Sequence, residues 1–365
     1  MTVDFFFSNG AANILTRITQ LSLLSWTVVQ IIYFMKFPSE QFMWDFGYSF
    51  FALSYVFTMI SIKYIQKKDM DAMDACIEKY FWNIKCCGSE LLVTFSERVR
   101  IGKILAWMQF LIGATNGVLF LPFESERLDL FFIITFLTKY YPEFYRYYKY
   151  IFFCLLSWGT TLVITQANIY LYHIIQLDFQ YKLLTKHVED IEIGIEQDYL
   201  NEKYDLEIRR RMKICVAHFQ KLTEFRQQFL DLIYYAFLFV LWIGLGVSMF
   251  IAYHLLVMKN SENFIALSFL WITVAECTCQ LSLLGQHYID MAEDFLFTLT
   301  RCKWYKWSNY NKKSYLLFLI YAQNYKIVCV GGFIPYNLSL AIWMSRKTMS
   351  ALTFFRAVRR IDNVA

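Results

Sequence analysis

The chain is dominated by long uncharged stretches, and these constrain its fold more than any other feature. A helix of about 20 apolar residues crosses the roughly 30 Å hydrocarbon layer of a bilayer. Of the 365 residues, 58% are hydrophobic and only 18% are charged, whereas an ordinary soluble protein has about 25% charged residues. We therefore expect an all-α, polytopic membrane protein with seven spans, at 18–35, 44–65, 102–121, 150–177, 229–257, 264–286 and 328–355.

Lysines and arginines are unequally distributed between the two sides that seven spans define. The side that holds the N-terminus carries 24 of them, and the opposite side carries 9. Because basic residues accumulate in cytoplasmic loops, this asymmetry predicts a cytoplasmic N-terminus and an exterior C-terminus. The predicted orientation is opposite to that of G-protein-coupled receptors, and neither an Asp-Arg-Tyr nor an Asn-Pro-x-x-Tyr motif is present.

The polar segments between the spans show helical periodicity. Within 178–228, apolar residues recur every three or four positions from Ile208 to Phe225, and the segment 287–327 has a similar pattern. We expect helices that continue beyond the membrane and pack on each other, either within one subunit or against a neighbouring subunit. The tyrosine-rich segment 122–149 is expected to lie at the bilayer surface or to cap the bundle.

The sequence lacks motifs for catalysis and for metal binding. The five histidines are scattered, the nine cysteines form no CxxC pair, and no nucleophile elbow, dinucleotide-binding loop or P-loop occurs. The basic run Arg209–Arg211 has acidic neighbours, so we interpret it as a solvated helix face or a lipid-headgroup contact. We expect neither an enzyme nor a cofactor, a metal or a nucleic-acid partner.

One carboxylate lies deep within a predicted span. Glu276 is about twelve residues, or roughly 18 Å, from the outer end of the segment 264–286. A charge at this depth needs a partner on a neighbouring helix or a water-filled space. Two interpretations stay open: a satisfied buried carboxylate, and a role in gating or ion passage.

Two C-terminal segments carry a family signature. The segment "CKWYKWSNYNKKSYLLFLIYAQ" (302–323) has a Trp-Tyr pair, basic residues and a Leu-rich run that ends in Ala-Gln. The segment "GGFIPYNLSLAIWMSRKTMSALTFF" (331–355) has Gly-Gly-Phe-x-Pro followed by Lys-Thr. Together they resemble the C-terminal signature of insect odorant receptors, although Met349–Ala351 stands where that family usually has a Ser-Tyr-Ser-type run. The matching residues are Trp304, Tyr305, Lys312, Lys313, Ala322, Gln323, Gly331, Gly332, Phe333, Pro335, Lys347 and Thr348.

The resemblance implies an odorant-gated, non-selective cation channel in the plasma membrane of a sensory neuron dendrite. It implies a hetero-tetramer with a shared odorant receptor coreceptor. It also divides the chain into six spans with the ligand pocket (1–286), cytoplasmic anchor helices (287–327), and a pore-lining last helix with a short extracellular tail (328–365). A gustatory-type receptor channel of the same architecture is the alternative, although its Thr-Tyr…Gln-Phe run is missing. A G-protein-coupled receptor is disfavoured by the predicted orientation.

The resemblance also places the odorant pocket in the outer half of the second, third, fourth and sixth helices. An apolar volatile gains affinity mainly by leaving water, at about 25 cal/mol per Å² buried. It therefore needs a concave apolar lining with few polar groups. For each side chain, ordinary helix packing is the alternative to ligand contact. The predicted lining residues are Tyr48, Phe51, Tyr55, Ile112, Asn116, Phe120, Phe152, Leu155, Trp158, Phe269 and Thr273.

The last predicted span contains two cations and no acidic residue. Arg346 and Lys347 fall in its outer half, where they either extend toward the outer headgroups or face the pore. No Asp or Glu occurs between Val328 and Ile361, whereas cation channels concentrate ions with acidic rings or carbonyl oxygens. We therefore expect the coreceptor to supply most of the conducting wall. Pore or gating candidates are Gly331, Gly332, Pro335, Arg346, Lys347 and Ser350, and subunit-anchor candidates are Trp304, Tyr305 and Gln323.

Overall fold

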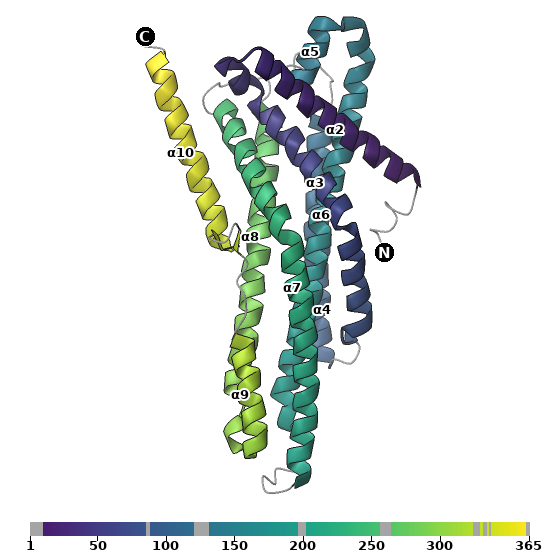
Figure 1. Ribbon diagram of the computed structural model, residues 1–365, viewed down its shortest axis with the longest axis vertical. Coiled ribbons are helices and arrows are strands. Elements are labelled where there is room, and N and C mark those ends of the chain that lie inside the picture. Colours follow the sequence, from purple (N-terminus) through teal and green to yellow (C-terminus); the bar gives the residue numbers. More distant parts are fainter. Residues whose placement is uncertain are drawn as a thin grey trace.

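In the computed structural model, the long apolar segments form helices that run side by side along one axis (Figure 1). The structure describes residues 10–84, 88–119, 131–195, 202–255, 264–323, 329–330, 334–335 and 337–362. The elements are α2 (Gly10–Lys36), α3 (Glu40–Tyr80), α4 (Ser89–Leu119), α5 (Phe132–Tyr140), α6 (Pro142–Glu189), η3 (Asp190–Glu192), α7 (Glu202–Tyr253), α8 (Phe264–Arg301), η5 (Trp304–Lys306), α9 (Asn309–Gln323), β1 (Cys329–Val330), β2 (Ile334–Pro335) and α10 (Leu338–Asp362).

Within the described residues, five helices are long and apolar enough to cross a membrane: α2, α3, α6, α7 and α8. The helices α6 and α7 contain 48 and 52 residues. At 1.5 Å per residue they are about 70–80 Å long, more than twice the thickness of the hydrocarbon layer. The chain is therefore an all-α, multi-pass membrane protein whose helices continue beyond the bilayer. The helices α4 and α10 are not among these five, so seven spans stay a prediction.

The helical extensions pack on each other at the end of the bundle where α9 lies (Figure 1). The apolar period of 178–228 is confirmed, because its residues form one buried stripe on α7. The rings of Phe219, Phe295 and Phe318 join α7, α8 and α9, with centroids 5.1 Å apart for Phe219 and Phe295 and 5.4 Å apart for Phe219 and Phe318. These extensions therefore pack within one subunit. The buried stripe is Ile208, Met212, Cys215, Phe219, Leu222 and Phe225.

Hydrogen bonds fix α9 to the same end of the bundle. The Tyr315 hydroxyl donates to the Leu299 carbonyl at 2.6 Å, and the Trp307 indole donates to Glu192 Oε1 at 2.6 Å. Burial, together with the nearby Cys302 thiol, raises the pKa of Tyr315, so its hydroxyl stays protonated and able to donate. The segment after α8 thereby folds back as a docked helix rather than a free loop.

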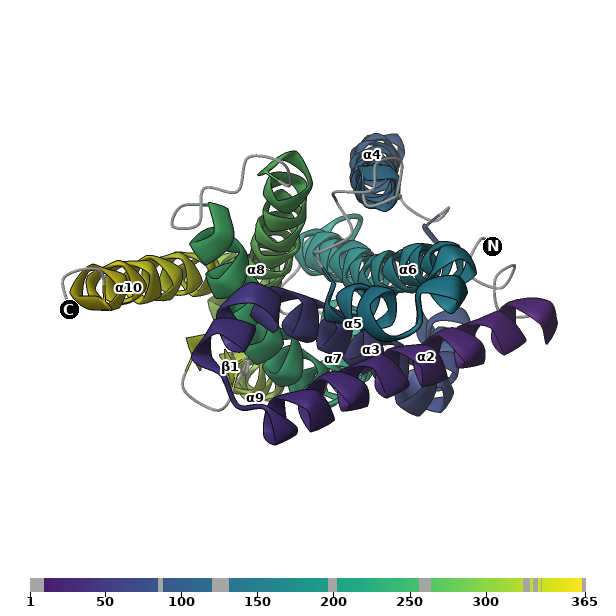
Figure 2. The same ribbon diagram turned by 90° about the horizontal axis from the view of Figure 1, so that it is seen from above.

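At the opposite end of the bundle, α5 lies beside the first turns of α6 (Figures 1 and 2). Where it is described, most of the segment 122–149 is helical. Pro142 lies in the first turn of α6, where a missing amide hydrogen removes no intrahelical bond. The short helix α5 buries Phe132, Ile133 and Ile134 and packs against α6 and α2. The helices α4 and α10 lie at the periphery (Figure 2).

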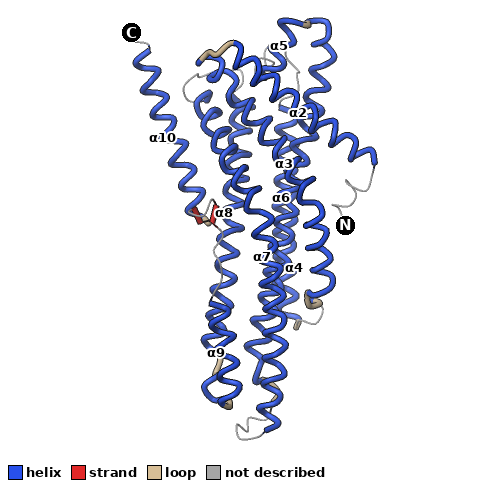
Figure 3. Tube along the Cα trace, viewed as in Figure 1, coloured by secondary structure: helices blue, strands red, loops and turns tan. Residues whose placement is uncertain are grey.

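The last helix begins later than the sequence predicts. A span from residue 328 was expected, but β1 and β2 pair as a short antiparallel ladder and α10 begins at Leu338 (Figure 3). Pro335 therefore lies in β2 and not in the first turns of the helix. Proline restricts its own φ and disfavours helical backbone at the preceding residue, which opposes a continuous helix here.

Asn337 provides the start signal that the sequence reading overlooked. Its Oδ1 accepts a hydrogen bond from the Ser339 amide at 3.0 Å, the contact by which an N-cap satisfies a first-turn donor. The helix therefore starts immediately after this residue. Gly331 and Gly332, which were expected at the inner end of the helix, lie outside the described residues.

Candidate functional site

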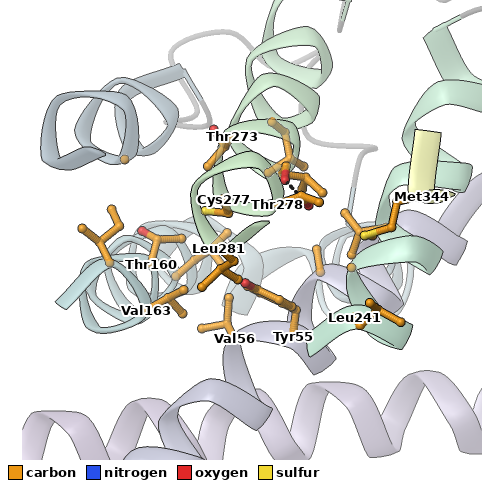
Figure 4. A pocket seen from close by; sticks show the side chains of 18 of the residues that line it. Tyr55, Val56, Thr160, Val163, Leu241, Thr273, Cys277, Thr278, Leu281 and Met344 are labelled. Atoms are coloured by element: carbon orange, nitrogen blue, oxygen red, sulfur yellow. Dashed lines mark hydrogen bonds between the residues drawn. The ribbon is translucent and has the colours of Figure 1, made fainter. Parts of the chain in front are cut away.

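A cavity of about 150 Å³ lies among α3, α4, α6, α7, α8 and α10 (Figure 4). Its wall is mostly aliphatic and aromatic, and small residues leave the space. Gly113 brings α4 close to α6, since a Cβ at this position would clash with Ile164. The lining includes Ala52, Tyr55 and Val56 of α3, Thr160, Val163 and Ile164 of α6, Phe237 and Leu241 of α7, Thr273, Cys277, Thr278 and Leu281 of α8, and Leu340 and Met344 of α10.

The few polar groups of this wall are hydroxyls and one thiol. Thr160, Thr273 and Thr278 each donate to a backbone carbonyl of their own helix at 2.8 or 2.9 Å. The oxygens of Thr160 and Thr278 therefore keep lone pairs as acceptors for a ligand. Tyr55 extends across the cavity toward Leu281 on α8 (Figure 4). Such a wall suits a small, mostly apolar molecule that carries few polar groups.

A second, smaller cavity of about 30 Å³ adjoins the first and has a more polar wall. Its wall includes the amides of Gln109 of α4 and Gln280 of α8, the carboxyl group of Glu276 of α8, and the hydroxyls of Tyr55, Tyr170 and Thr273. Gln109 Nε2 donates to Gln280 Oε1 and, at 3.4 Å, to Glu276 Oε1. The thiol of Cys277 donates to Glu276 Oε2 at 3.7 Å. Glu276 is thus a carboxylate with partners on a neighbouring helix and on its own.

Three of the predicted lining residues lie at these cavities. Tyr55 and Thr273 line both of them, and Ile112 lines the smaller one. They come from the second, sixth and third of the predicted spans. The structure therefore brings together residues more than 200 positions apart in the sequence.

Other predicted lining residues are engaged in helix packing. The ring of Tyr48 lies 4.8 Å from that of His254, and Phe51 stacks on Phe250 with centroids 5.5 Å apart. Phe152 packs 4.5 Å from Trp26. Their contact with a ligand stays a prediction.

The remaining predicted lining residues face elsewhere or are not described. Leu155 is buried in the core beside α2 and α5, and Trp158 donates to Thr16 Oγ1 at 3.3 Å. Phe269 is 36% exposed. The side chain of Asn116 and the whole of Phe120 lie outside the described residues.

Sequence reasoning missed the walls that α7 and α10 supply. Phe237 and Leu241 of α7 and Leu340 and Met344 of α10 line the larger cavity. On α7 no periodic signal could have found them, because its span carries apolar residues on most sides; on α10 the polar run Ser345–Lys347 marks an outward face, and this signal was not used for Leu340 and Met344. The face that a helix turns inward is then decided by its neighbours.

The pore and anchor candidates that the structure describes lie outside the cavities. Arg346, Lys347 and Ser350 are exposed on α10, and the Lys347 ammonium lies 5.8 Å from the Trp343 ring centroid. Thr348 and Met344 are buried and face the bundle. The anchor candidates lie at the α9 end, where Tyr305 and Gln323 are exposed and Trp304 packs against the core.

A polar chain connects α10 to the bundle beside the cavity. The Trp271 indole of α8 donates to Ser248 Oγ of α7 at 3.3 Å. Ser248 Oγ in turn lies 3.4 Å from Thr348 Oγ1 of α10. The last helix is therefore held by both polar and apolar contacts with α7 and α8.

The chain is similar to known proteins in both sequence and fold. The sequence matches the family model described as 7tm Odorant receptor over residues 83–349. The solved structure of the olfactory receptor OR5 from the insect Machilis hrabei has a TM-score of 0.69 at 9% identity, covering 95% of this chain and 88% of that one. The same receptor in complex with eugenol has a TM-score of 0.65 at 11% identity, with the same coverage. No curated protein matches the sequence.

Proposed function

The chain belongs to the 7tm odorant receptor family, and on that premise we propose that it is the ligand-binding subunit of an odorant-gated cation channel. It binds a small, mostly apolar volatile in the larger cavity. It opens a non-selective cation channel as a hetero-tetramer with a coreceptor. It lies in the plasma membrane with a cytoplasmic N-terminus, an orientation that the distribution of basic residues supports.

The observation that carries this proposal is the contribution of α10 to the cavity wall. Leu340 and Met344 face the same space as Tyr55 and Thr273. A ligand in that space touches the last helix directly, and it favours the α10 position that contacts it best. The site can therefore convert ligand binding into movement of a helix whose exposed residues include Arg346 and Lys347.

The size and chemistry of the cavity support a small ligand. A dry apolar cavity of about 150 Å³ is large enough for a molecule such as benzene, and the present cavity has that volume. The OR5 structure in complex with eugenol supports the same class of ligand. Burial of the apolar body supplies most of the affinity, and the hydroxyls of the wall orient a single polar group.

The exposed side of α9 supports assembly with other subunits through the proposed anchor region 287–327. Leu317 and Ile320 are 68% and 56% exposed, and Tyr305 is 59% exposed at the same end of the bundle. Apolar patches of this kind mark protein contacts. Because no acidic residue occurs between Val328 and Ile361, we assign most of the conducting wall to the coreceptor.

The experiment is to co-express the chain with a coreceptor and record currents evoked by a panel of volatiles. In this setting Met344→Trp is expected to fill the cavity and to shift the concentration–response curve to at least roughly tenfold higher concentration, since overpacking of an apolar site is strongly unfavourable. Met108 is 52% exposed on α4, so Met108→Trp is the matched control and should respond like the wild type.

Equal responses of the two tryptophan variants would contradict the assignment of this cavity. Responses that require GTP in excised patches would contradict a directly gated channel. Large odorant-evoked cation currents from the chain expressed alone would contradict the role assigned to the coreceptor.

A further inference from the structure

We infer that the smaller cavity is a polar annex that selects odorants carrying one hydroxyl group. The polar annex is this smaller cavity, whose wall includes the side chains of Gln109, Glu276 and Gln280. This inference rests on the proposed function, in which the larger cavity holds the apolar body of the odorant. The inference specifies the polar group of that odorant, namely a hydroxyl.

The annex adjoins the larger cavity. Tyr55, Thr273 and Cys277 are among the residues that line both spaces, so the two spaces are direct neighbours. In our inference, the functional group of a ligand in the larger space enters the smaller one between these side chains. The annex has a volume of about 30 Å³, and this is enough for a group of one or two heavy atoms. It therefore accepts a single functional group and excludes a second ring or a branched chain.

The amide side chains of the annex are incompletely satisfied. Gln109 is only 4% exposed, and its Nε2 is engaged with Gln280 and Glu276. Among the described residues, Gln109 Oε1 and Gln280 Nε2 are buried without a hydrogen-bond partner. One hydrogen-bond acceptor and one hydrogen-bond donor of the annex therefore have no partner on the protein. If the oxygen and nitrogen of both amides are exchanged, one donor and one acceptor are again without a partner.

A hydroxyl is the smallest group that can form hydrogen bonds with both of these amide atoms. It donates one hydrogen bond and accepts others, so it can serve both unsatisfied atoms at once. A carbonyl offers only an acceptor, an ammonium offers only donors, and a hydrocarbon offers neither. A ligand carboxylate would lie beside the Glu276 carboxyl group. Because buried polar atoms without partners are unfavourable in a low-dielectric site, the annex favours an alcohol over its isosteres.

A competing explanation is that these side chains only connect α4 to α8, since side-chain amides commonly form hydrogen bonds between membrane helices. A bound water would then occupy the annex in every complex. In that case ligands of equal size would bind equally well whatever their functional group. Ligand discrimination therefore separates the two explanations, whereas protein stability does not.

The test measures dissociation constants on the purified full-length chain in lipid nanodiscs, with tryptophan fluorescence as the signal. The probes are benzyl alcohol, benzaldehyde and ethylbenzene, which have the same number of heavy atoms. The wild type should bind benzyl alcohol roughly tenfold more tightly than the other two, the ratio expected for about one additional buried hydrogen bond. Equal affinity for the three probes would overturn the inference.

The variant Gln109→Met/Gln280→Met removes both amides at nearly constant volume. In this variant the dissociation constant of benzyl alcohol should lie within about twofold of that of ethylbenzene, and the affinity for ethylbenzene should be retained. Gln280→Met alone makes the same test if the double variant does not fold, and it should lower the preference. Gln228→Met, at an exposed position of α7 that lines neither cavity, is the control and should keep the wild-type preference. A preference that survives removal of the amides would overturn the inference.

This measurement is independent of channel activity. A hydroxyl preference that depends on the amides supports the annex even if no volatile evokes a current, and that second result would reject the proposed channel function alone. Odorant-evoked currents without any such preference would reject the annex alone.

Discussion

At the level of single residues, one buried carboxylate joins three helices where the predicted spans meet their extensions. Asp178 of α6 has a side chain that is 3% exposed, and it pairs with Arg98 of α4. His287 Nε2 of α8 lies 3.3 Å from Asp178 Oδ1, and Lys182 Nζ lies 3.9 Å from Oδ2. A buried charge that loses its partners is strongly destabilising, so this cluster holds α4 and α8 against α6.

Replacing this carboxylate should therefore weaken the fold. Asp178→Asn keeps the size of the side chain and removes its charge, and it should lower the free energy of unfolding by about 2 kcal/mol. The measurement is chemical denaturation of the purified protein in detergent. Asp190→Asn is the matched control, because Asp190 forms a surface pair with Lys186, and its effect should stay below about 1 kcal/mol. Equal effects would show that the Asp178 cluster contributes no more than a surface pair.

At the level of helices, the packing of α7, α8 and α9 depends on aromatic rings at their shared contact. Phe219 is 3% exposed and touches both Phe295 and Phe318. Ring pairs of this kind add to the stabilisation that comes from burying apolar area. Because the three rings belong to three helices, loss of one ring should loosen all of them together.

Phe219→Ala should lower the free energy of unfolding by about 3–5 kcal/mol, the range for a large side chain removed from a packed core. Phe297 lies on the same extension of α8 but is 57% exposed, so Phe297→Ala should change stability by no more than about 0.5 kcal/mol. Thermal unfolding followed by circular dichroism ranks the two variants. A larger effect at Phe297 would contradict the arrangement of these three helices.

At the level of the whole molecule, α5 lies at one end of the bundle, and α9, which exposes apolar side chains, lies at the other end (Figure 1). The α9 helix is already docked on α7 and α8 through its buried face. Its outward face remains available to another subunit. In the function proposed above, this exposed surface serves assembly with another subunit.

Leu317→Glu should reduce the amount of coreceptor that co-purifies with the tagged chain by at least roughly tenfold, since a charge in the centre of an apolar contact is unfavourable. Lys313→Glu changes the charge at another exposed position of the same helix. It should reduce the amount of co-purified coreceptor far less. Both variants should keep the wild-type unfolding midpoint, because neither side chain is buried. Undiminished co-purification with Leu317→Glu would exclude this side of α9 from the subunit contact.

The sequence by itself determined the class of the protein, because its signals are local. Apolar length predicted helices that cross a membrane, and the period of apolar residues from Ile208 to Phe225 predicted the buried stripe of α7. The C-terminal signature indicated the family that the match over residues 83–349 shows. Each of these signals is contained in a short stretch of chain, so no knowledge of the three-dimensional arrangement was required.

Only the tertiary structure decided which faces of the helices meet. Gln109 and Gln280 are 171 positions apart and yet share the annex, and Met344 reaches the cavity from a helix that begins ten residues later than predicted. In a helix that is apolar on most sides, the 3.6-residue period marks no inward face. The lining of the cavity is therefore a property of how the helices pack against one another, and this depends on the whole chain at once.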